Sequence, residues 1–284
     1  FNIINRIKFY NFQLLIINDG SNDESLNYLK SLKLKNNNIS IIDFSKNFGK
    51  EAALTAGIDN AIGEAVIPID CDLQDPPSLI LELIREWEKG FDIVEARRID
   101  RNNDTIFKKV TANFFHSLLN LLTNNVISKN VGDYRLISKE VILQIKKLKE
   151  RNRYMKGLLS WPGFNKTYVE YKRLKRSAGK SKFNLFKLFQ LALDGITSFS
   201  VIPLKAISLF GIVGALTSII FSIIILFQKF FLSSLISGYA FLIMILLFFG
   251  SLQLISLGII GEYIGKIYFE VKQRPIYIIK KFYK

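Results

Sequence analysis

Two long stretches near the C-terminal end contain no charged residue, and they restrict the fold more than any other feature. They run from Ala206 to Phe227 and from Phe230 to Gly261. A helix needs about 20 apolar residues to cross the hydrocarbon core of a bilayer. A helical hairpin buried in a soluble core is the alternative, but such helices seldom stay uncharged on every face for this length. We therefore expect two transmembrane helices, the second beginning near Gly238.

The charges that flank these stretches predict their orientation. The connection between them carries a single charged residue, Lys229, whereas the tail from Glu262 to Lys284 is rich in lysine and arginine. Positively charged flanks remain on the cytoplasmic side of a membrane. We expect a multi-pass protein of the inner (cytoplasmic) membrane, with its large N-terminal region and its C-terminus in the cytoplasm.

The net charge of +15 points to an anionic partner. Much of this charge lies between Arg151 and Lys187, where the one acidic residue is Glu170. Charge alone leaves a phosphorylated ligand, a lipid surface and nucleic acid open as partners. The chain has one cysteine and one histidine, which excludes both a disulfide and a zinc site built from these residues.

The N-terminal half alternates strand-like and helix-like segments. The apolar runs FQLLIIND, ISIIDFS and EAVIPID are typical of strands, and the segments that follow each of them have helical spacing. This alternation predicts a mostly parallel sheet, whose ligands bind beyond the carboxyl ends of the strands. Asp19 and Asp70 both follow apolar runs, so we expect them to lie near each other at that edge.

Three carboxylates crowd the segment VIPIDCDLQDPP, which ends at Pro77. Carboxylates two residues apart, such as Asp70 and Asp72, can hold Mg²⁺ or Mn²⁺ together with substrate phosphates. Asp75 precedes two prolines, a pattern that also begins helices. Taken alone, the segment leaves a metal site and a set of helix-capping aspartates open.

The order of several motifs favours the metal site, because in these motifs the sequence resembles the family-2 inverting glycosyltransferases. Within them it is similar to the membrane-bound polyprenyl-phosphate sugar transferases of the bactoprenol glucosyltransferase and dolichol-phosphate mannose synthase type. The matching stretches are NDGSND (18–23), NFGKEAALTAGIDNAIGE (47–64), DCDLQDPP (70–77), GDYRLIS (132–138), RYMKGLLSWPGF (153–164), RSAGKSKF (176–183), LDGITSFSVIPLK (193–205) and GEYIGKIYFEVKQRPIY (261–277).

The resemblance implies a fold and a division of the chain. The fold is an α/β GT-A catalytic domain, Rossmann-like with a mostly parallel sheet, followed by an interfacial helix and two transmembrane helices. The implied divisions are a nucleotide-sugar-binding domain (1–150), a basic gating loop with juxtamembrane helices (151–204), the transmembrane helices (205–262) and a basic cytoplasmic tail (263–284).

The implied activity is transfer of one hexose to polyprenyl phosphate, with inversion, for modification of cell-envelope glycans. Glucose from UDP-glucose is the donor that the resemblance favours. Mg²⁺ or Mn²⁺ is the implied cofactor, and the partners are a nucleotide diphosphate sugar, a polyprenyl phosphate lipid and the membrane, with no nucleic acid. The glycines of the second apolar stretch would also suit packing into a homo-oligomer.

The resemblance also assigns roles to individual residues. The implied metal ligands are Asp70 and Asp72, and the implied catalytic residues are Asp72, Asp133 and Arg135. Donor binding would involve Asp19, Asp70, Gln74, Asp75, Arg176, Ser181 and Lys182, and the acceptor phosphate would meet Arg97, Arg98 and Arg135. A polyprenyl phosphate brings its own nucleophilic oxygen, so Asp133 is expected to orient the acceptor more than to deprotonate it.

One departure from the family pattern concerns the first strand. Members begin with a strand and a loop that grips the nucleotide base, whereas here FNIINRIKFYNFQ leads directly into the strand that is second in the family. The first strand would be central to the sheet. Its absence has two interpretations: the sequence is a fragment of a longer chain, with the domain at 1–150 truncated at its N-terminus, or the protein is an impaired or inactive membrane-anchored relic that acts as a scaffold.

Overall fold

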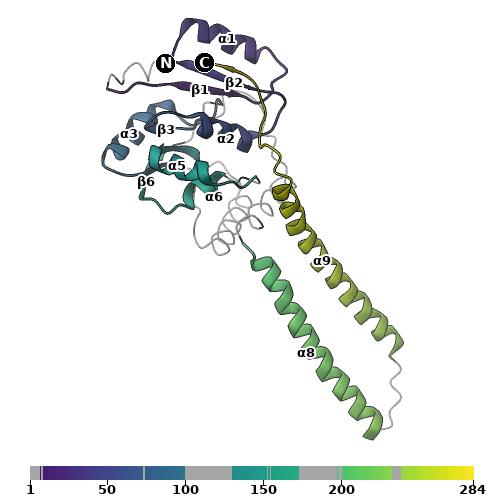
Figure 1. Ribbon diagram of the computed structural model, residues 1–284. Coiled ribbons are helices and arrows are strands. Elements are labelled where there is room, and N and C mark those ends of the chain that lie inside the picture. The colour runs from purple at the N-terminus through teal and green to yellow at the C-terminus, as the bar shows by residue number, and fades with distance from the viewer. Residues whose placement is uncertain are drawn as a thin grey trace. The chain divides into compact units, whose positions relative to one another are not determined.

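The computed structural model describes residues 7, 9–72, 74–99, 130–151, 153, 155–172, 197, 200–231 and 238–284 (Figure 1). The chain divides into two compact units. The first comprises residues 1–192 together with 273–284, and the second comprises residues 193–272.

The first unit contains a three-stranded sheet in the order β1-β2-β7. Strands β1 (Leu14–Asn18) and β2 (Ile39–Phe44) are parallel and are connected by helix α1 (Ser25–Lys35). Strand β2 is buried at every position, as its apolar sequence predicts for a strand covered on both faces. Helix α2 (Lys50–Asn60) follows β2 and packs its alanines against this strand.

A second, four-stranded sheet has the order β3-β5-β4-β6. Its strands are β3 (Ala65–Val66), β4 (Ile93–Arg98), β5 (Val131–Ser138) and β6 (Lys166–Tyr171). Strand β4 is parallel to β6 and antiparallel to β5, which is also antiparallel to β3. A short 3₁₀ turn (Pro77–Leu79) leads into helix α3 (Ile80–Glu88), which packs on this sheet. Helices α5 (Lys139–Lys147) and α6 (Met155–Ser160) follow β5 in the same unit.

The predicted α/β architecture is confirmed, although both sheets are mixed rather than mostly parallel. The alternation of strands and helices indicated parallel crossovers, and it gave no sign that β5 and β7 would join the sheets in the opposite direction. Strands β1 and β3 each lie at the end of a sheet. A central strand between them, which the family resemblance implies, is not found among the described residues.

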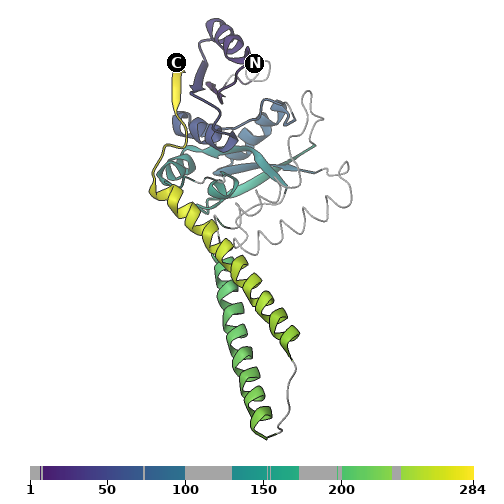
Figure 2. The same ribbon diagram turned by 90° about the vertical axis from the view of Figure 1, so that its right-hand side faces the viewer.

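The C-terminal segment belongs to the first unit. Strand β7 (Ile279–Tyr283) pairs with β2 in antiparallel fashion, and Figures 1 and 2 show it beside the N-terminal strands. The ring of Tyr277 stacks on Phe44 with 5.2 Å between ring centroids. Its hydroxyl donates a hydrogen bond of 3.1 Å to Asp59, and burial together with this carboxylate raises the pKa of Tyr277 to about 12. The tail expected at 263–284 is thus divided between the end of a helix and a docked strand.

The second unit is dominated by two long apolar helices, α8 (Ile202–Phe231) and α9 (Tyr239–Val271). The segments 202–221 and 245–271 have mean hydropathies of 2.0 and 1.8, and by length and composition both helices could cross a membrane. Helix α9 begins directly after Gly238, as predicted. The interfacial helix expected before the first span and the turn between the spans lie almost wholly outside the described residues, and the orientation in the membrane stays a prediction.

We predict that Tyr277→Ala lowers the free energy of unfolding of the first unit by about 2 kcal/mol, because the change removes a half-buried ring from the packing against β2. Thermal unfolding of the full chain in detergent would measure the loss as a drop of several degrees in Tm. Lys280→Ala is the control, since this exposed side chain belongs to the same segment. An unchanged Tm for Tyr277→Ala would show that the C-terminal segment contributes no stability.

Candidate active site

The loop between β2 and α2 is tied to the end of β1 by Asp19. The two carboxylate oxygens of Asp19 accept hydrogen bonds from the backbone N–H groups of Phe48 (2.7 Å) and Gly49 (3.0 Å). A carboxylate at the N-terminus of a helix satisfies N–H groups that lack partners within the helix and interacts favourably with the helix dipole. In this structure Asp19 therefore positions the start of α2.

Gly20 permits this close approach. Its φ of +62° lies in the left-handed region, and a Cβ atom placed there would lie 2.3 Å from the carbonyl carbon of Lys46. The clash would be with backbone, which cannot move aside as a flexible side chain can. A larger residue at position 20 would therefore separate the end of β1 from the loop that Asp19 binds.

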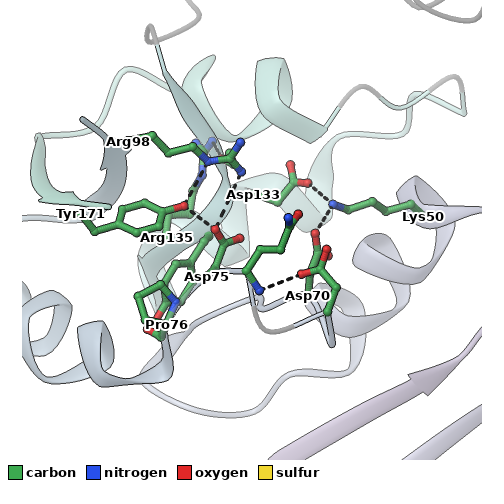
Figure 3. Close-up of polar contacts among 12 residues, drawn as sticks. Lys50, Asp70, Asp75, Pro76, Arg98, Asp133, Arg135 and Tyr171 are labelled. Atoms are coloured by element: carbon green, nitrogen blue, oxygen red, sulfur yellow. Dashed lines mark hydrogen bonds and ion pairs between the residues drawn. The ribbon is translucent and has the colours of Figure 1, made fainter. Parts of the chain in front are cut away.

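Lys50, the first residue of α2, joins two carboxylates from other elements (Figure 3). Its ammonium nitrogen lies 2.7 Å from Oδ2 of Asp70 and 2.7 Å from Oδ2 of Asp133. Burial alone would lower the pKa of Lys50, but the charges and hydrogen bonds of Asp133 and Asp70 outweigh this effect and raise it above its ordinary value. The ammonium is therefore fully charged at neutral pH.

Asp72 lies in the turn after Asp70. Its Oδ1 accepts a hydrogen bond of 3.1 Å from the backbone N–H of Gln74, which shapes this turn. Within the described part of the chain no group of three or more acidic, histidine or cysteine side chains could hold a metal ion. Two carboxylates nevertheless fit Mg²⁺ or Mn²⁺, because these hard ions commonly take one or two protein carboxylates and complete their shell with substrate phosphates and water.

Asp75 faces the interior rather than the edge of the site. It is 3% exposed and accepts a hydrogen bond from the hydroxyl of Tyr171. A guanidinium nitrogen of Arg98 lies 3.8 Å from the same carboxylate, and the Nε of Arg98 donates to the Tyr171 hydroxyl at 3.1 Å. Burial and the bond to Asp75 raise the pKa of Tyr171 to about 12. This network, drawn in Figure 3, holds the turn that carries Asp72.

Arg135 is buried and lies two residues after Asp133 in β5. Its side chain is 2% exposed and lies 3.4 Å from Glu95, which is 5% exposed. Its second terminal nitrogen donates a 2.7 Å hydrogen bond to the carbonyl of Gly132, the residue that precedes Asp133. Arg135 thus fixes the backbone from which Asp133 extends.

The structure brings some of the predicted site residues together and separates others. Lys50 links Asp70 to Asp133. Asp19 binds Phe48 and Gly49, the two residues before Lys50, so Asp19 and Asp70 both contact the segment 48–50. Arg97 lies over the ring of Tyr168 at 4.5 Å. Arg176, Ser181 and Lys182 lie outside the described residues, and the roles assigned to all these residues stay predictions.

Sequence reasoning missed two residues of this site. Lys50 lies in the matching stretch NFGKEAALTAGIDNAIGE, to which the resemblance assigns no role, although its place after an apolar strand is a usable signal. Tyr171 ends an alternating strand, and nothing in the local sequence indicates that its hydroxyl reaches Asp75.

Comparison with known proteins identifies the family. Residues 2–145 match the model described as Glycosyl transferase family 2. The chain belongs to this family. It is 47% identical over 273 residues to the uncharacterized glycosyltransferase YkcC of Bacillus subtilis. The matched region covers 96% of this chain and 84% of that protein.

Two further relatives carry more specific names. The chain is 46% identical over 275 residues to the SfII prophage-derived bactoprenol glucosyl transferase of Shigella flexneri, covering 97% of this chain and 89% of the relative. It is 44% identical over 275 residues to the prophage bactoprenol glucosyl transferase homolog of Escherichia coli, covering 97% and 90%. In both cases the similarity includes the two apolar helices.

We predict that Glu95→Ala destabilises the first unit by about 3–5 kcal/mol, because it removes the carboxylate beside the buried Arg135. Urea or thermal unfolding would measure the change. The double variant Glu95→Leu with Arg135→Met should recover most of the loss, since an apolar pair of similar size needs no counter-charge.

The control for this prediction is Glu64→Ala. Glu64 pairs with Lys139 at 2.7 Å, but both side chains are well exposed, so its loss should cost less than about 1 kcal/mol. Equal effects of Glu95→Ala and Glu64→Ala would contradict a structural role for the buried pair.

Proposed function

We propose that the protein transfers a sugar from a nucleotide diphosphate sugar to polyprenyl phosphate at the cytoplasmic face of the membrane. The observation that carries the proposal is the 46% identity to a bactoprenol glucosyl transferase over 97% of the chain. This similarity includes the catalytic unit and both long apolar helices, which suits a lipid acceptor. Glucose from UDP-glucose is the donor that we propose first.

In the proposed reaction an oxygen of the acceptor phosphate attacks the anomeric carbon. The new carbon–oxygen bond forms as the bond to the nucleoside diphosphate breaks, with inversion at that carbon. A phosphate monoester with a second pKa of about 6 is largely dianionic at neutral pH, so the nucleophile needs no strong base. Asp133 would orient the acceptor, because its side chain is 13% exposed and is held by Lys50.

The leaving diphosphate gains negative charge as the bond breaks. Asp70 and Asp72 would hold Mg²⁺ or Mn²⁺, which when bound stabilises that charge electrostatically. The described arginines differ in their suitability for the acceptor phosphate. Arg135 is buried against Glu95, and Arg98 is bonded to Tyr171 and lies near Asp75. Because neighbouring residues of a strand point to opposite faces, we assign the acceptor phosphate to Arg97, which is partly exposed at the end of β4.

An inactive, membrane-anchored scaffold is the other candidate that the sequence suggested. The relatives are named as transferases, which favours an enzyme and gives the scaffold no support. We also propose, on the family resemblance alone, that the protein forms a homo-oligomer and that its product serves the modification of cell-envelope glycans.

We predict that Asp72→Ala lowers transfer by at least about 100-fold, because it removes a ligand for the ion that stabilises the leaving group. Membranes containing the full chain would be incubated with a panel of radiolabelled nucleotide sugars, and the lipid extract would be analysed for polyprenyl-phosphate sugar. EDTA should abolish the product, and Mg²⁺ or Mn²⁺ should restore it.

Glu140→Ala is a suitable control, because this exposed residue lies in the first turn of α5 and should leave transfer unchanged. Wild-type activity in Asp72→Ala would refute the metal assignment. Absence of a lipid-linked product with every donor would refute the proposed function itself.

A further inference from the structure

We propose that Lys50 is the built-in counter-ion of the site. Its ammonium holds Asp70 and Asp133 together before the donor binds, and it would give up Asp70 when that carboxylate holds a divalent ion. The inference rests on the proposed function, because it takes Asp70 as a metal ligand. It adds a positioning residue to which the family motifs gave no role.

The geometry supports an exchange of cations at Asp70. One ammonium nitrogen lies 2.7 Å from an oxygen of each aspartate, and the three residues come from α2, the turn after β3, and β5 (Figure 3). An ammonium group is a compact point charge with three donors, so it can serve two carboxylates at once. A divalent ion bound to Asp70 would compete for the same negative charge.

The two aspartates differ in their dependence on Lys50. The side chain of Asp70 is 38% exposed, whereas that of Asp133 is 13% exposed. Water can replace Lys50 more readily at the exposed carboxylate of Asp70 than at the enclosed carboxylate of Asp133. Giving up an ion pair costs a buried carboxylate more free energy than it costs an exposed one. We therefore place the exchange at Asp70 and expect Lys50 to remain with Asp133.

The backbone keeps Lys50 in place during this exchange. The carboxylate of Asp19 binds the N–H groups of Phe48 and Gly49, the two residues before Lys50. The released ammonium would thus stay beside the anionic oxygens of the donor diphosphate and the acceptor phosphate. Lys50 would link occupancy of the metal site to the position of Asp133.

Binding of Mn²⁺ to the full chain in detergent, followed by electron paramagnetic resonance without any donor, tests this inference. Lys50→Met should bind Mn²⁺ about fivefold more tightly than the wild type, the factor expected when the ion no longer displaces an exposed ion pair. Mn²⁺ should also raise the Tm of Lys50→Met more than that of the wild type, because the variant lacks its own counter-ion.

Three further variants complete the comparison. Lys139→Met removes a lysine whose 2.7 Å ion pair with Glu64 lies on the surface, and its affinity for Mn²⁺ should stay within about twofold of the wild type. Lys50→Arg keeps the charge and should also stay within that range. Lys50→Gln provides the same comparison if Lys50→Met does not fold.

The outcomes separate this inference from the proposed function. Equal or weaker Mn²⁺ binding by folded Lys50→Met and Lys50→Gln would overturn the role of Lys50, while loss of binding in Asp72→Ala would still support the metal site. Absence of Mn²⁺ binding in the wild type and in every Lys50 variant would overturn this inference, whereas the proposed function would be overturned only by the absence of a lipid-linked sugar product.

Discussion

The charges of Asp70 and Asp133 meet at one ammonium group, and the arrangement of the site depends on that contact. Two carboxylates close together repel each other unless a cation lies between them. Lys50 supplies this cation from the first turn of α2, at 2.7 Å from each carboxylate. The positions of the helix, of the turn after β3 and of strand β5 are thereby coupled through electrostatics as well as through packing.

The other charged side chains near the contact of Lys50 with Asp70 and Asp133 have partners of their own. Asp19 is occupied by backbone N–H groups at the start of α2, and Asp75 is enclosed by Tyr171 and Arg98. Arg135 is directed to Glu95 and to the carbonyl of Gly132. Buried charges are costly unless they are paired and hydrogen-bonded, which explains why these polar groups occur as connected sets.

The sequence predicted the parts of this protein that depend on local pattern. The two apolar helices, the helical segments after β1 and β2, and the family follow from uncharged runs, periodicity and ordered motifs, and the structure and the relatives confirm them. The docking of β7 on β2 could not be predicted, because the pairing partners are far apart in sequence and the tail is rich in lysine.

The site shows the same limit at the level of single residues. Its acidic residues stand out in the sequence, since three carboxylates crowd one short segment after an apolar strand. Whether a side chain faces solvent or the interior depends on distant partners, so the burial of Arg135 and Asp75 and the bridging position of Lys50 were not visible. Only the contacts in the structure show which of the predicted site residues face solvent and which are buried.

The most direct test of the account is calorimetric binding of UDP to the full chain in detergent, with Mg²⁺ and with EDTA. The account predicts that binding of this anionic nucleotide requires the divalent ion, because Asp70 and Asp72 would otherwise repel its phosphates. Binding of equal affinity in EDTA would contradict the claim that this acidic edge recognises its nucleotide through a metal ion.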